Sequence, residues 1–312
     1  MTATTPPPPA DNLPLRCVTI DVEEYFHIEA AYGVIERSQW DTMPSRVDRN
    51  IDLLLELMRG HGLRGTFFIL GDVARRNPAV VTRIADAGHE IASHGANHDR
   101  LHRLDRETFR QDLRTCKGLL EDRVGRAVVG YRAPTFSLVP QTAWAIDVLL
   151  ECGFQYDSSI YPVHHPLYGV PAAPDRPFHV RAAPDRPSIF EIPPLTLRVS
   201  GKNFAVAGGG YFRLLPLWFM KRGLAQAAGE NRPSILYFHP WEFDPDMPRL
   251  PLKLLGRVRT YTGLKSAARR LDSILSQPAR WSPIGEALDD LRHFAEGQTV
   301  FTLSTLIHPD TD

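Results

Sequence analysis

The feature that most constrains the fold of this chain is a regular alternation of strand-like and helix-like segments. Short runs that favour β-strands lie at 17–21, 66–70, 89–93, 128–132, 154–157 and 234–239. Segments with apolar residues at helical spacing lie at 45–59, 72–87, 106–122, 141–151 and 214–227. Alternation at this spacing predicts parallel βαβ units, arranged either as an open doubly wound sheet or as a closed barrel.

The two ends of the chain differ from this alternating part. Residues 1–14 are rich in Thr and Pro, which predicts a disordered tail. Helical patterns at 264–275 and 284–294 follow the last clear strand-like run and lead to a short apolar run at 300–303. They predict a helical extension over 244–312. The whole chain of 312 residues is long enough for one large domain or two small ones.

Composition limits the partners and the chemistry. Lys plus Arg and Asp plus Glu are equal at 36 each, so no net charge attracts nucleic acid or an anionic membrane. No apolar stretch is long enough to span a bilayer. The three cysteines are an odd number with no close pair, which favours a reducing compartment over a disulfide framework.

An acidic cluster ends the first strand-like run. Asp21, Glu23 and Glu24 lie within four residues, and such carboxylates repel one another unless a cation or a shared proton relieves the repulsion. In an extended chain Asp21 and Glu23 point to the same side, so both can face one site. The alternative is a solvated acidic turn.

A histidine cluster follows the run 89–93. His94 and His98 are four residues apart, and so are His98 and His102. One helical turn would place either pair on one face, so the spacing does not choose between them. Two imidazoles with one carboxylate suit a divalent metal such as zinc and leave a coordination position open. Histidines on an ordinary surface helix are the competing interpretation.

Two further polar residues end strand-like runs. Arg132 can hold Asp21 ionised and oriented, because a guanidinium is a fixed fork for a carboxylate; an ordinary structural ion pair is the alternative. His239 can act as a general acid, because imidazole titrates near neutral pH; a hydrogen-bonded core histidine is the alternative. Both sheet architectures build their functional sites from residues at the carboxyl ends of parallel strands.

Two loop-like segments carry no catalytic motif. The glycines 208–210 lack the spacing of a phosphate loop, and we expect a mobile or tightly turned loop beside the pocket. The sequence Ala-Ala-Pro-Asp-Arg-Pro occurs at 172–177 and again at 182–187. Its Pro-Asp chemistry predicts two turns of a surface hairpin or an irregular loop.

Taken together, the motifs and their order resemble the polysaccharide deacetylase family (NodB homology, carbohydrate esterase family 4) over about residues 15–243. The sequence is most similar to the branch associated with exosortase and exopolysaccharide loci. That similarity rests on Asp-Val-Glu-Glu-Tyr-Phe (21–26), Gly-Gly-Gly-Tyr-Phe-Arg (208–213), His-Pro-Trp-Glu (239–242) and the helical extension. The resemblance implies an α/β fold, a distorted barrel of the (β/α)7 type, with the extension 244–312 packed on the same domain.

Carried over position by position, the resemblance implies a role for each residue of the motifs. Asp21 matches the catalytic base, Arg132 the arginine that braces the base, and His239 the general acid. His94 and His98 match the two histidine ligands of the metal.

The resemblance also implies contacts with the substrate. Leu236 or its apolar neighbours would wall the pocket for the acetyl methyl group, and a backbone N–H near Tyr131 would help to hold the oxyanion. Pro134 and Trp241 complete the expected substrate-binding set. Trp241, Tyr211 and Phe212 can stack on sugar faces, although aromatic residues near a strand end also belong to cores.

The chain departs from the family at Val22, where most members have a second aspartate that binds the metal. Members with an Asp-x-Asp form place the metal role one residue later, which is Glu23 in this chain. Glu24 is the other candidate. A related amidohydrolase-like branch with the same fold includes members that use no metal.

The resemblance therefore implies a metal-dependent hydrolase, with zinc as the expected ion, that removes N-acetyl groups from a GlcNAc-containing polysaccharide or its precursor in exopolysaccharide biosynthesis. The alternatives are an allantoinase-like hydrolase of cyclic amides or imides on the same fold and a non-catalytic glycan-binding member. The expected partner is a glycan. Residues 1–12 contain no apolar run of the signal-peptide type. We expect a cytoplasmic location, with the inner membrane face as an alternative because extracellular glycans are often assembled there.

Overall fold

A computed structural model describes residues 13–306 of the chain. Its strands form one sheet of ten strands and a separate two-stranded hairpin. The strands of the main sheet are β1 (Leu15–Val22), β2 (Thr66–Ile69), β3 (Glu90–Ser93), β4 (Gly130–Tyr131), β5 (Tyr156–Asp157), β6 (Phe178–Arg181), β7 (Ser188–Glu191), β10 (Ser234–Phe238), β11 (Arg280–Trp281) and β12 (Phe301–Thr302). The hairpin consists of β8 (Thr196–Val199) and β9 (Lys202–Ala205).

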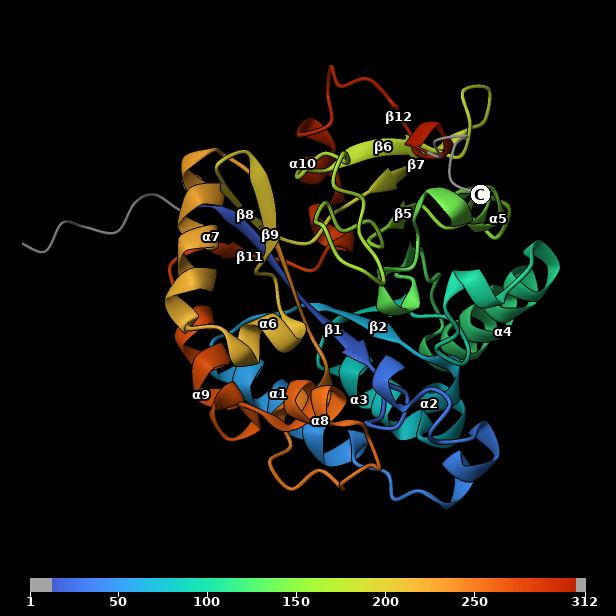
Figure 1. Cartoon of the computed structure of the whole chain (residues 1–312), viewed down its shortest axis with the longest axis vertical. Helices are drawn as coiled ribbons and strands as arrows, with labels where there is room; N and C mark the ends of the chain where they lie inside the picture. The colour runs from blue at the N-terminus through green and yellow to red at the C-terminus, as the bar shows by residue number, and fades with distance from the viewer. Residues whose placement is uncertain (1–12, 307–312) are drawn as a thin grey trace, which may run out of the picture.

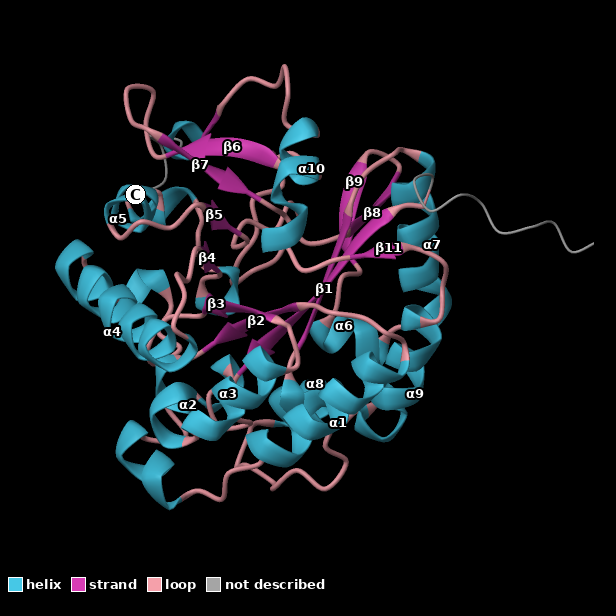
Figure 2. Cartoon of the chain, turned by 180° about the vertical axis from the view of Figure 1, so that it is seen from behind, coloured by secondary structure: helices cyan, strands magenta, loops and turns pink. Residues whose placement is uncertain are grey.

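The helices lie mainly on the outside of the sheet, as Figures 1 and 2 show. They are α1 (Val47–Gly60), α2 (Gly71–Arg76), α3 (Pro78–Asp86), α4 (Arg106–Val124), α5 (Ala145–Glu151), α6 (Gly209–Leu214), α7 (Leu217–Gly229), α8 (Leu254–Tyr261), α9 (Leu264–Leu275) and α10 (Leu288–His293). Within residues 13–306, no helix combines the length and the apolar character needed to cross a bilayer.

The main sheet confirms the α/β class. Its order is β10-β1-β2-β3-β4-β5-β7-β6-β12, with β11 beside β1, and the strands from β10 to β7 run parallel. Among the described residues this order does not close into a regular barrel. The segment between β7 and β10 instead approaches β10 through single hydrogen bonds: Leu195 N–H donates to Ile235 O (2.9 Å), and Tyr237 N–H donates to Ala207 O (3.2 Å).

The central strand shows why the sheet forms. Every residue of β1 is buried, because β10 and β2 pair with its two edges and its alternate apolar side chains belong to two core clusters. Helix α1 turns Val47, Ile51, Leu54 and Met58 toward the core at helical spacing. The fold therefore follows the hydrophobic pattern of the sequence and fixes the direction in which β1 ends.

Several expected helices are shorter in the structure than in the sequence pattern. The helix expected at 72–87 is split into α2 and α3, because Pro78 occupies the first turn of a new helix. The one expected at 214–227 begins only after Pro216, and the one at 141–151 begins with a 3-10 turn before α5. Periodicity located these helices, but the prolines set their ends.

The repeat and the two ends of the chain complete the comparison with the sequence pattern. The second copy of the repeat, at 182–187, is the turn between the antiparallel strands β6 and β7, and the first copy leads into β6. The extension contributes β11 and β12 to the main sheet in addition to its helices. Residues 1–12 of the expected tail and 307–312 of the extension lie outside the described residues.

Candidate active site

A cavity of about 430 Å³ opens where β1, β3 and β10 end. The carboxyl ends of parallel strands meet at one edge of a sheet, so residues that are far apart in sequence gather there. Its lining includes Asp21, Glu23, His94, His98, Tyr211, His239 and Trp241. Six of these are residues that the sequence singled out, and Tyr211 was named as an aromatic that can stack on sugar.

Three side chains in this cavity form a compact donor cluster. Glu23, His94 and His98 are buried, and one ligand atom from each lies within 4.8 Å of the others. The helical turn expected for the two histidines is wrong, because both lie in a loop with positive φ at Gly95 (78°) and His98 (59°). His102 is exposed on a separate 3-10 turn, so the structure selects the pair His94 and His98.

The surroundings of His94 favour a neutral imidazole with one free nitrogen. Nδ1 lies 2.8 Å from the carbonyl oxygen of Arg132 and must donate to it, because a carbonyl only accepts. The tautomer leaves Nε2 without a proton and able to bind a cation. Burial lowers the pKa of His94 to about 4, against an ordinary value of 6.5. The ring is therefore in the form that binds a metal.

One carboxylate oxygen of Glu23 accepts a hydrogen bond, and the other has no hydrogen-bond partner. Oε1 accepts a hydrogen bond from Trp241 Nε1 (2.8 Å). Oε2 lies 2.7 Å from His98 Nε2, but it is buried without an aligned hydrogen bond. Burial alone would raise the pKa of Glu23, but His98, His239 and His94 outweigh it and hold the pKa below its ordinary value. A buried ionised oxygen between two imidazoles fits a divalent cation.

Glu24 does not belong to this cluster. Its carboxylate accepts hydrogen bonds from the Ser45 hydroxyl (2.5 Å) and from the backbone N–H groups of Arg46 (3.0 Å) and Val47 (3.1 Å). These groups lie at the start of α1, whose first N–H groups have no partner within the helix. Of the two glutamates left open by the sequence, the structure places Glu23 among the histidines.

Asp21 is held by a buried arginine. Arg132 Nη1 donates to Asp21 Oδ1 (2.7 Å) and to the Thr19 hydroxyl (2.7 Å). Nε and Nη2 of Arg132 donate to the carbonyl oxygen and the hydroxyl of Ser158 (3.0 and 2.8 Å). The guanidinium thereby links β1 to the residue after β5. It leaves Asp21 Oδ2 facing the cavity, 3.9 Å from His239 Nε2.

His239 is held by a pair that the sequence prediction missed. Its Nδ1 lies 2.5 Å from Glu242 Oε1, and Glu242 Oε2 accepts from Arg213 Nε (3.0 Å). Burial alone would lower the pKa of His239, but Glu23, Glu242 and Asp21 raise it to about 9. The imidazole is therefore protonated and able to donate from Nε2.

A sequence signal for this pair existed. Glu242 follows His239 at a spacing of three residues within the short 3-10 turn Pro240–Phe243, so the two side chains can meet. Both Glu242 and Arg213 lie in motifs quoted for the family resemblance, at 239–242 and 208–213, but without a role of their own.

Three of the expected substrate contacts, Pro134, Leu236 and Phe212, lie away from the cavity lining. The Tyr131 ring packs in the core against Phe109 and Phe154, and the oxyanion contact expected of a backbone N–H near Tyr131 stays a prediction. Leu236 and Phe238 alternate with Tyr237 and His239 along β10, so they face the other side of the strand. Pro134 is buried outside the lining, and Phe212 packs against Phe238 and Phe243. Trp241 does line the cavity, and its ring stacks on His239 with 5.2 Å between ring centres.

The three glycines at 208–210 form a tight approach to β10. A Cβ added at Gly208 would lie 1.6 Å from the Tyr237 carbonyl oxygen, so only glycine fits there. Gly209, at φ 59°, begins α6 and lines the cavity with Gly210. The expectation of a tightly turned segment beside the pocket is confirmed.

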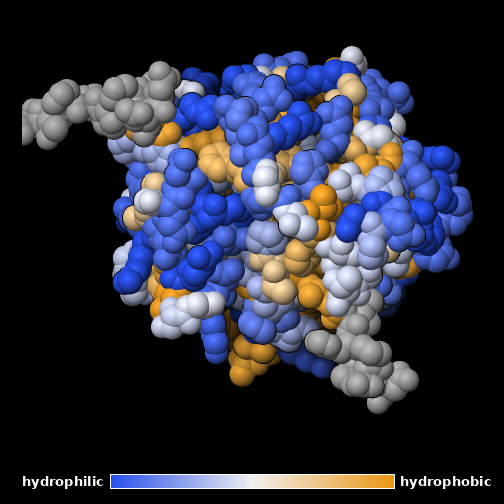
Figure 3. Space-filling view, turned by 90° about the horizontal axis from the view of Figure 1, so that it is seen from above, coloured by the Kyte–Doolittle hydropathy of each residue, from blue (hydrophilic) through white to orange (hydrophobic). Residues whose placement is uncertain are grey.

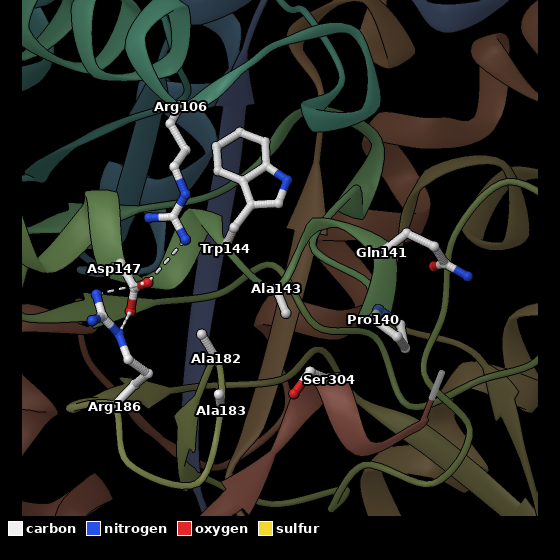
Figure 4. Close-up of a pocket in the computed structure, with 10 residues that line it drawn as sticks. All are labelled: Arg106, Pro140, Gln141, Ala143, Trp144, Asp147, Ala182, Ala183, Arg186 and Ser304. Atoms are coloured by element: carbon white, nitrogen blue, oxygen red, sulfur yellow. Dashed lines mark hydrogen bonds and ion pairs between the residues drawn. The ribbon is translucent and has the colours of Figure 1, made fainter. Parts of the chain in front are cut away.

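A second depression, shown in Figure 4, lacks such chemistry. Its one carboxylate, Asp147, lies between Arg106 and Arg186 at ion-pair distances of 3.2 and 2.9 Å. The charges are paired with one another, and the remaining lining is mostly small or apolar. The candidate active site is therefore the cavity at the strand ends.

The fold and this cavity together define a class: an α/β protein with a metal-type donor cluster, a braced carboxylate and a protonated imidazole at the carboxyl edge of a parallel sheet. Residues 38–156 match the sequence profile of the polysaccharide deacetylase family, and residues 158–289 match that of a domain of unknown function, DUF3473. Over residues 38–156 the chain is therefore similar to polysaccharide deacetylases.

Known relatives match part of the chain. The peptidoglycan-N-acetylglucosamine deacetylase of Bacillus cereus is 30% identical over 95 residues, which are 30% of this chain and 34% of the relative. The peptidoglycan deacetylase of Helicobacter pylori is 31% identical over 110 residues, 35% of this chain and 36% of the relative. The chain thus spans about a third of the length of these curated relatives.

Solved structures match nearly the whole chain. A protein of Mycobacterium smegmatis described as a polysaccharide deacetylase has a TM-score of 0.62 at 22% identity, covering 99% of both chains. Puue allantoinase has a TM-score of 0.58 at 17% identity, covering 94% of this chain and 95% of its own. At these identities the likeness shows the shared fold.

Proposed function

We propose that this protein is a metal-dependent hydrolase that removes N-acetyl groups from a GlcNAc-containing polysaccharide or its precursor, in exopolysaccharide biosynthesis. One arrangement carries the proposal. The donor cluster Glu23, His94 and His98 lies beside the braced carboxylate Asp21 and the carboxylate-held imidazole His239. A metal-dependent amide hydrolase needs these three parts together: a place for a cation, a proton acceptor and a proton donor.

The metal proposed for the cluster is zinc. Two imidazole nitrogens and one carboxylate oxygen form a donor set of the catalytic zinc type. A bound divalent cation would supply Lewis acidity toward the acetyl carbonyl and the attacking water. The committed hydrogen bonds of His94 Nδ1 and Glu23 Oε1 orient the remaining donor atoms toward one point.

Asp21 and His239 divide the proton transfers between them. Asp21 Oδ2 accepts the proton of the attacking water, while Arg132 holds the carboxylate in place. His239, protonated at Nε2, gives a proton to the departing amine. Glu242 holds His239 by Nδ1 and so directs Nε2 into the cavity.

The walls of the cavity suit a sugar. Trp241, Tyr211, Tyr168 and Phe136 line it, and flat aromatic faces pack well on the apolar faces of sugar rings. Two relatives are named as deacetylases of glycans, the peptidoglycan-N-acetylglucosamine deacetylase of Bacillus cereus and the chitooligosaccharide deacetylase of a Bradyrhizobium strain. They support an N-acetylated glycan as the substrate class.

The alternatives are separable by assay. A cyclic-amide hydrolase is favoured by the fold shared with Puue allantoinase and by Val22, which stands where most members of the family have a second aspartate. A glycan-binding protein without activity needs no carboxylate braced like Asp21 and no imidazole held like His239. We therefore rank the deacetylase first.

The test combines metal analysis with acetate release. The purified protein is expected to hold about one zinc or similar ion per chain and to release acetate from N-acetylated chitooligosaccharides until a chelator is added. His98→Ala and Glu23→Gln should lose metal and acetate release together. Glu24→Gln is the matched control, because the Glu24 carboxylate caps α1 and lies outside the donor cluster. This variant should retain both the metal and acetate release. Zinc-loaded protein that releases no acetate but hydrolyses allantoin would overturn the proposal.

A further inference from the structure

One segment beside the active site has an unusual charge. Residues 247–271 contain seven basic residues and no Asp or Glu, although the chain as a whole is neutral. The basic residues are Arg249, Lys253, Arg257, Arg259, Lys265, Arg269 and Arg270. The segment includes the whole of α8 and most of α9. It therefore concentrates positive charge in one part of a neutral protein.

Helix α8 also exposes large apolar side chains. Leu254 is 77% exposed, Leu255 63% and Val258 48%, and Leu254 is the most exposed large hydrophobic residue in the described chain. Their spacing puts them on adjoining positions of one helical face. The protein face seen in Figure 3 is largely hydrophilic, with hydrophobic residues in clusters among the polar ones. The two most exposed large hydrophobic residues of the described chain are the neighbours Leu254 and Leu255 on α8.

Helix α8 is held to the rest of the protein near its C-terminal end, beside the mouth of the cavity. Arg213 donates to the carbonyl oxygens of Arg259 (2.9 Å), Thr260 (3.1 Å) and Thr262 (2.7 Å). Arg259 and Thr260 also line the candidate active site. Figure 1 shows α8 in orange near α6, with which it is in contact. The leucines are therefore presented outward by a helix whose far end is fixed.

We propose that α8 and its flanking basic residues are a docking surface for an anionic lipid bilayer. Exposed leucines on a short amphipathic helix enter the headgroup boundary, and the surrounding Lys and Arg side chains attract anionic lipids. The docked protein would hold the mouth of its cavity at the membrane surface. The proposal does not depend on the deacetylase activity.

Charge complementarity favours a bilayer over a second copy of the chain. A two-fold dimer through α8 would bring the same basic segment of both copies together, with no acidic residue from 247 to 271 to neutralise it. Anionic lipids supply the missing negative charge. The eight residues of α8 are too few to cross a bilayer, so the contact is confined to its surface.

The proposal predicts binding to vesicles and its loss on substitution. The full chain should co-sediment with phosphatidylcholine–phosphatidylglycerol vesicles, weakly with phosphatidylcholine alone, and less as salt rises. The double variant Leu254→Ser with Leu255→Ser should lower the partition coefficient by about tenfold or more. Lys253→Gln with Arg257→Gln should lower it by about tenfold at low salt.

Matched controls lie on remote exposed positions. Phe204→Ser on β9 removes an apolar side chain that is 45% exposed, and Lys202→Gln with Arg222→Gln removes two exposed charges. These controls should bind vesicles like the unchanged chain, and circular dichroism should show that every variant is folded.

Three outcomes would overturn the proposal. The first is that the unchanged chain does not bind anionic vesicles, and the second is that the α8 variants and the controls lose vesicle binding equally. The third is that the chain self-associates in place of binding vesicles and that the α8 variants abolish this self-association, which would identify α8 as an interface between copies.

Discussion

Two buried arginine–carboxylate pairs flank the candidate active site, and they are held by different parts of the fold. Arg132 and Asp21 are fixed by sheet residues, because the guanidinium also binds Thr19 on β1 and Ser158 after β5. Arg213 and Glu242 lie outside the sheet. Their arginine is fixed by backbone carbonyl oxygens near the end of α8.

The difference between the pairs explains how one kind of interaction produces two chemical roles. The sheet-held pair leaves Asp21 Oδ2 facing the cavity as a proton acceptor. The second pair uses both oxygens of Glu242, one on Arg213 and one on His239, so the group that reaches the cavity is a protonated imidazole. At the second pair, the group that faces the cavity is therefore a proton donor, His239, and not the carboxylate itself.

The largest expected effect is on the acceptor side. Asp21→Asn should lower the rate of acetate release by about 10²–10⁴-fold, because an amide does not accept a proton from water at neutral pH. Bound metal should stay, since Asp21 is outside the donor cluster. Elemental analysis and acetate assays on the same sample check both. Full activity in this variant would show that Asp21 is not the base.

The donor side should show a smaller effect with a distinct pH signature. Glu242→Gln should lower kcat by about tenfold or more and move the alkaline limb of its pH profile to lower pH. The reason is that Glu242 helps to raise the pKa of His239 to about 9, and a general acid works only while protonated. An unchanged alkaline limb, measured from kcat across pH, would assign Glu242 a purely structural role.

A substitution in the second arginine tests whether the pair outside the sheet contributes less to catalysis than the pair held by the sheet. Arg213→Lys keeps the charge but loses the fork that binds Glu242 and three carbonyl oxygens. We expect a several-fold lower kcat and a lower free energy of unfolding, by about 1–3 kcal/mol. Arg132→Lys should lower kcat more, because Arg132 contacts Asp21 directly. The reverse order, in parallel denaturant and kinetic measurements, would contradict the comparison.

The last expected effect is on stability and concerns the acid sensitivity of the sheet. His89 is buried, Gly65 N–H donates to its Nδ1 (3.0 Å), and burial lowers its pKa from 6.5 to about 4. As pH falls, His89 is therefore protonated in the unfolded chain at a higher pH than in the folded chain. Stability should decline from about pH 6.5 to about pH 4 by at most about 1.4 kcal/mol per pH unit.

The variant His89→Asn checks that contribution. It retains an acceptor for Gly65 but no titrating group, so its stability should vary less with pH in this window than that of the unchanged chain. Urea unfolding at several pH values provides the measurement. Equal slopes for both proteins would place the acid sensitivity elsewhere.

The strand ends were the most predictable part of the site. Asp21, Arg132 and His239 each follow an apolar run, and a parallel sheet brings such ends to one edge. The alternation along a strand also placed Asp21 and Glu23 on one side. The same rule, applied to β10, would have turned Leu236 away from the cavity that His239 faces.

Other features could not be derived from periodicity. The spacing of His94 and His98 suggested a helix, but a loop with positive φ at Gly95 and His98 brings the two rings together. The Glu242–Arg213 pair joins residues 29 positions apart across an irregular segment. Short-range patterns report which face a residue occupies, and they carry no information on where a loop returns.

The sequence by itself determined the alternating α/β architecture and the residue types at the strand ends, because hydrophobic spacing of 2 and 3.6 residues acts locally. The tertiary structure decided which of two adjacent glutamates joins the histidines. Glu23 continues the direction of β1 into the cavity, while Glu24 meets the start of α1 more than twenty residues later. Neighbouring carboxylates have the same chemistry, so only the return of the chain assigns one to the cluster and the other to a helix end.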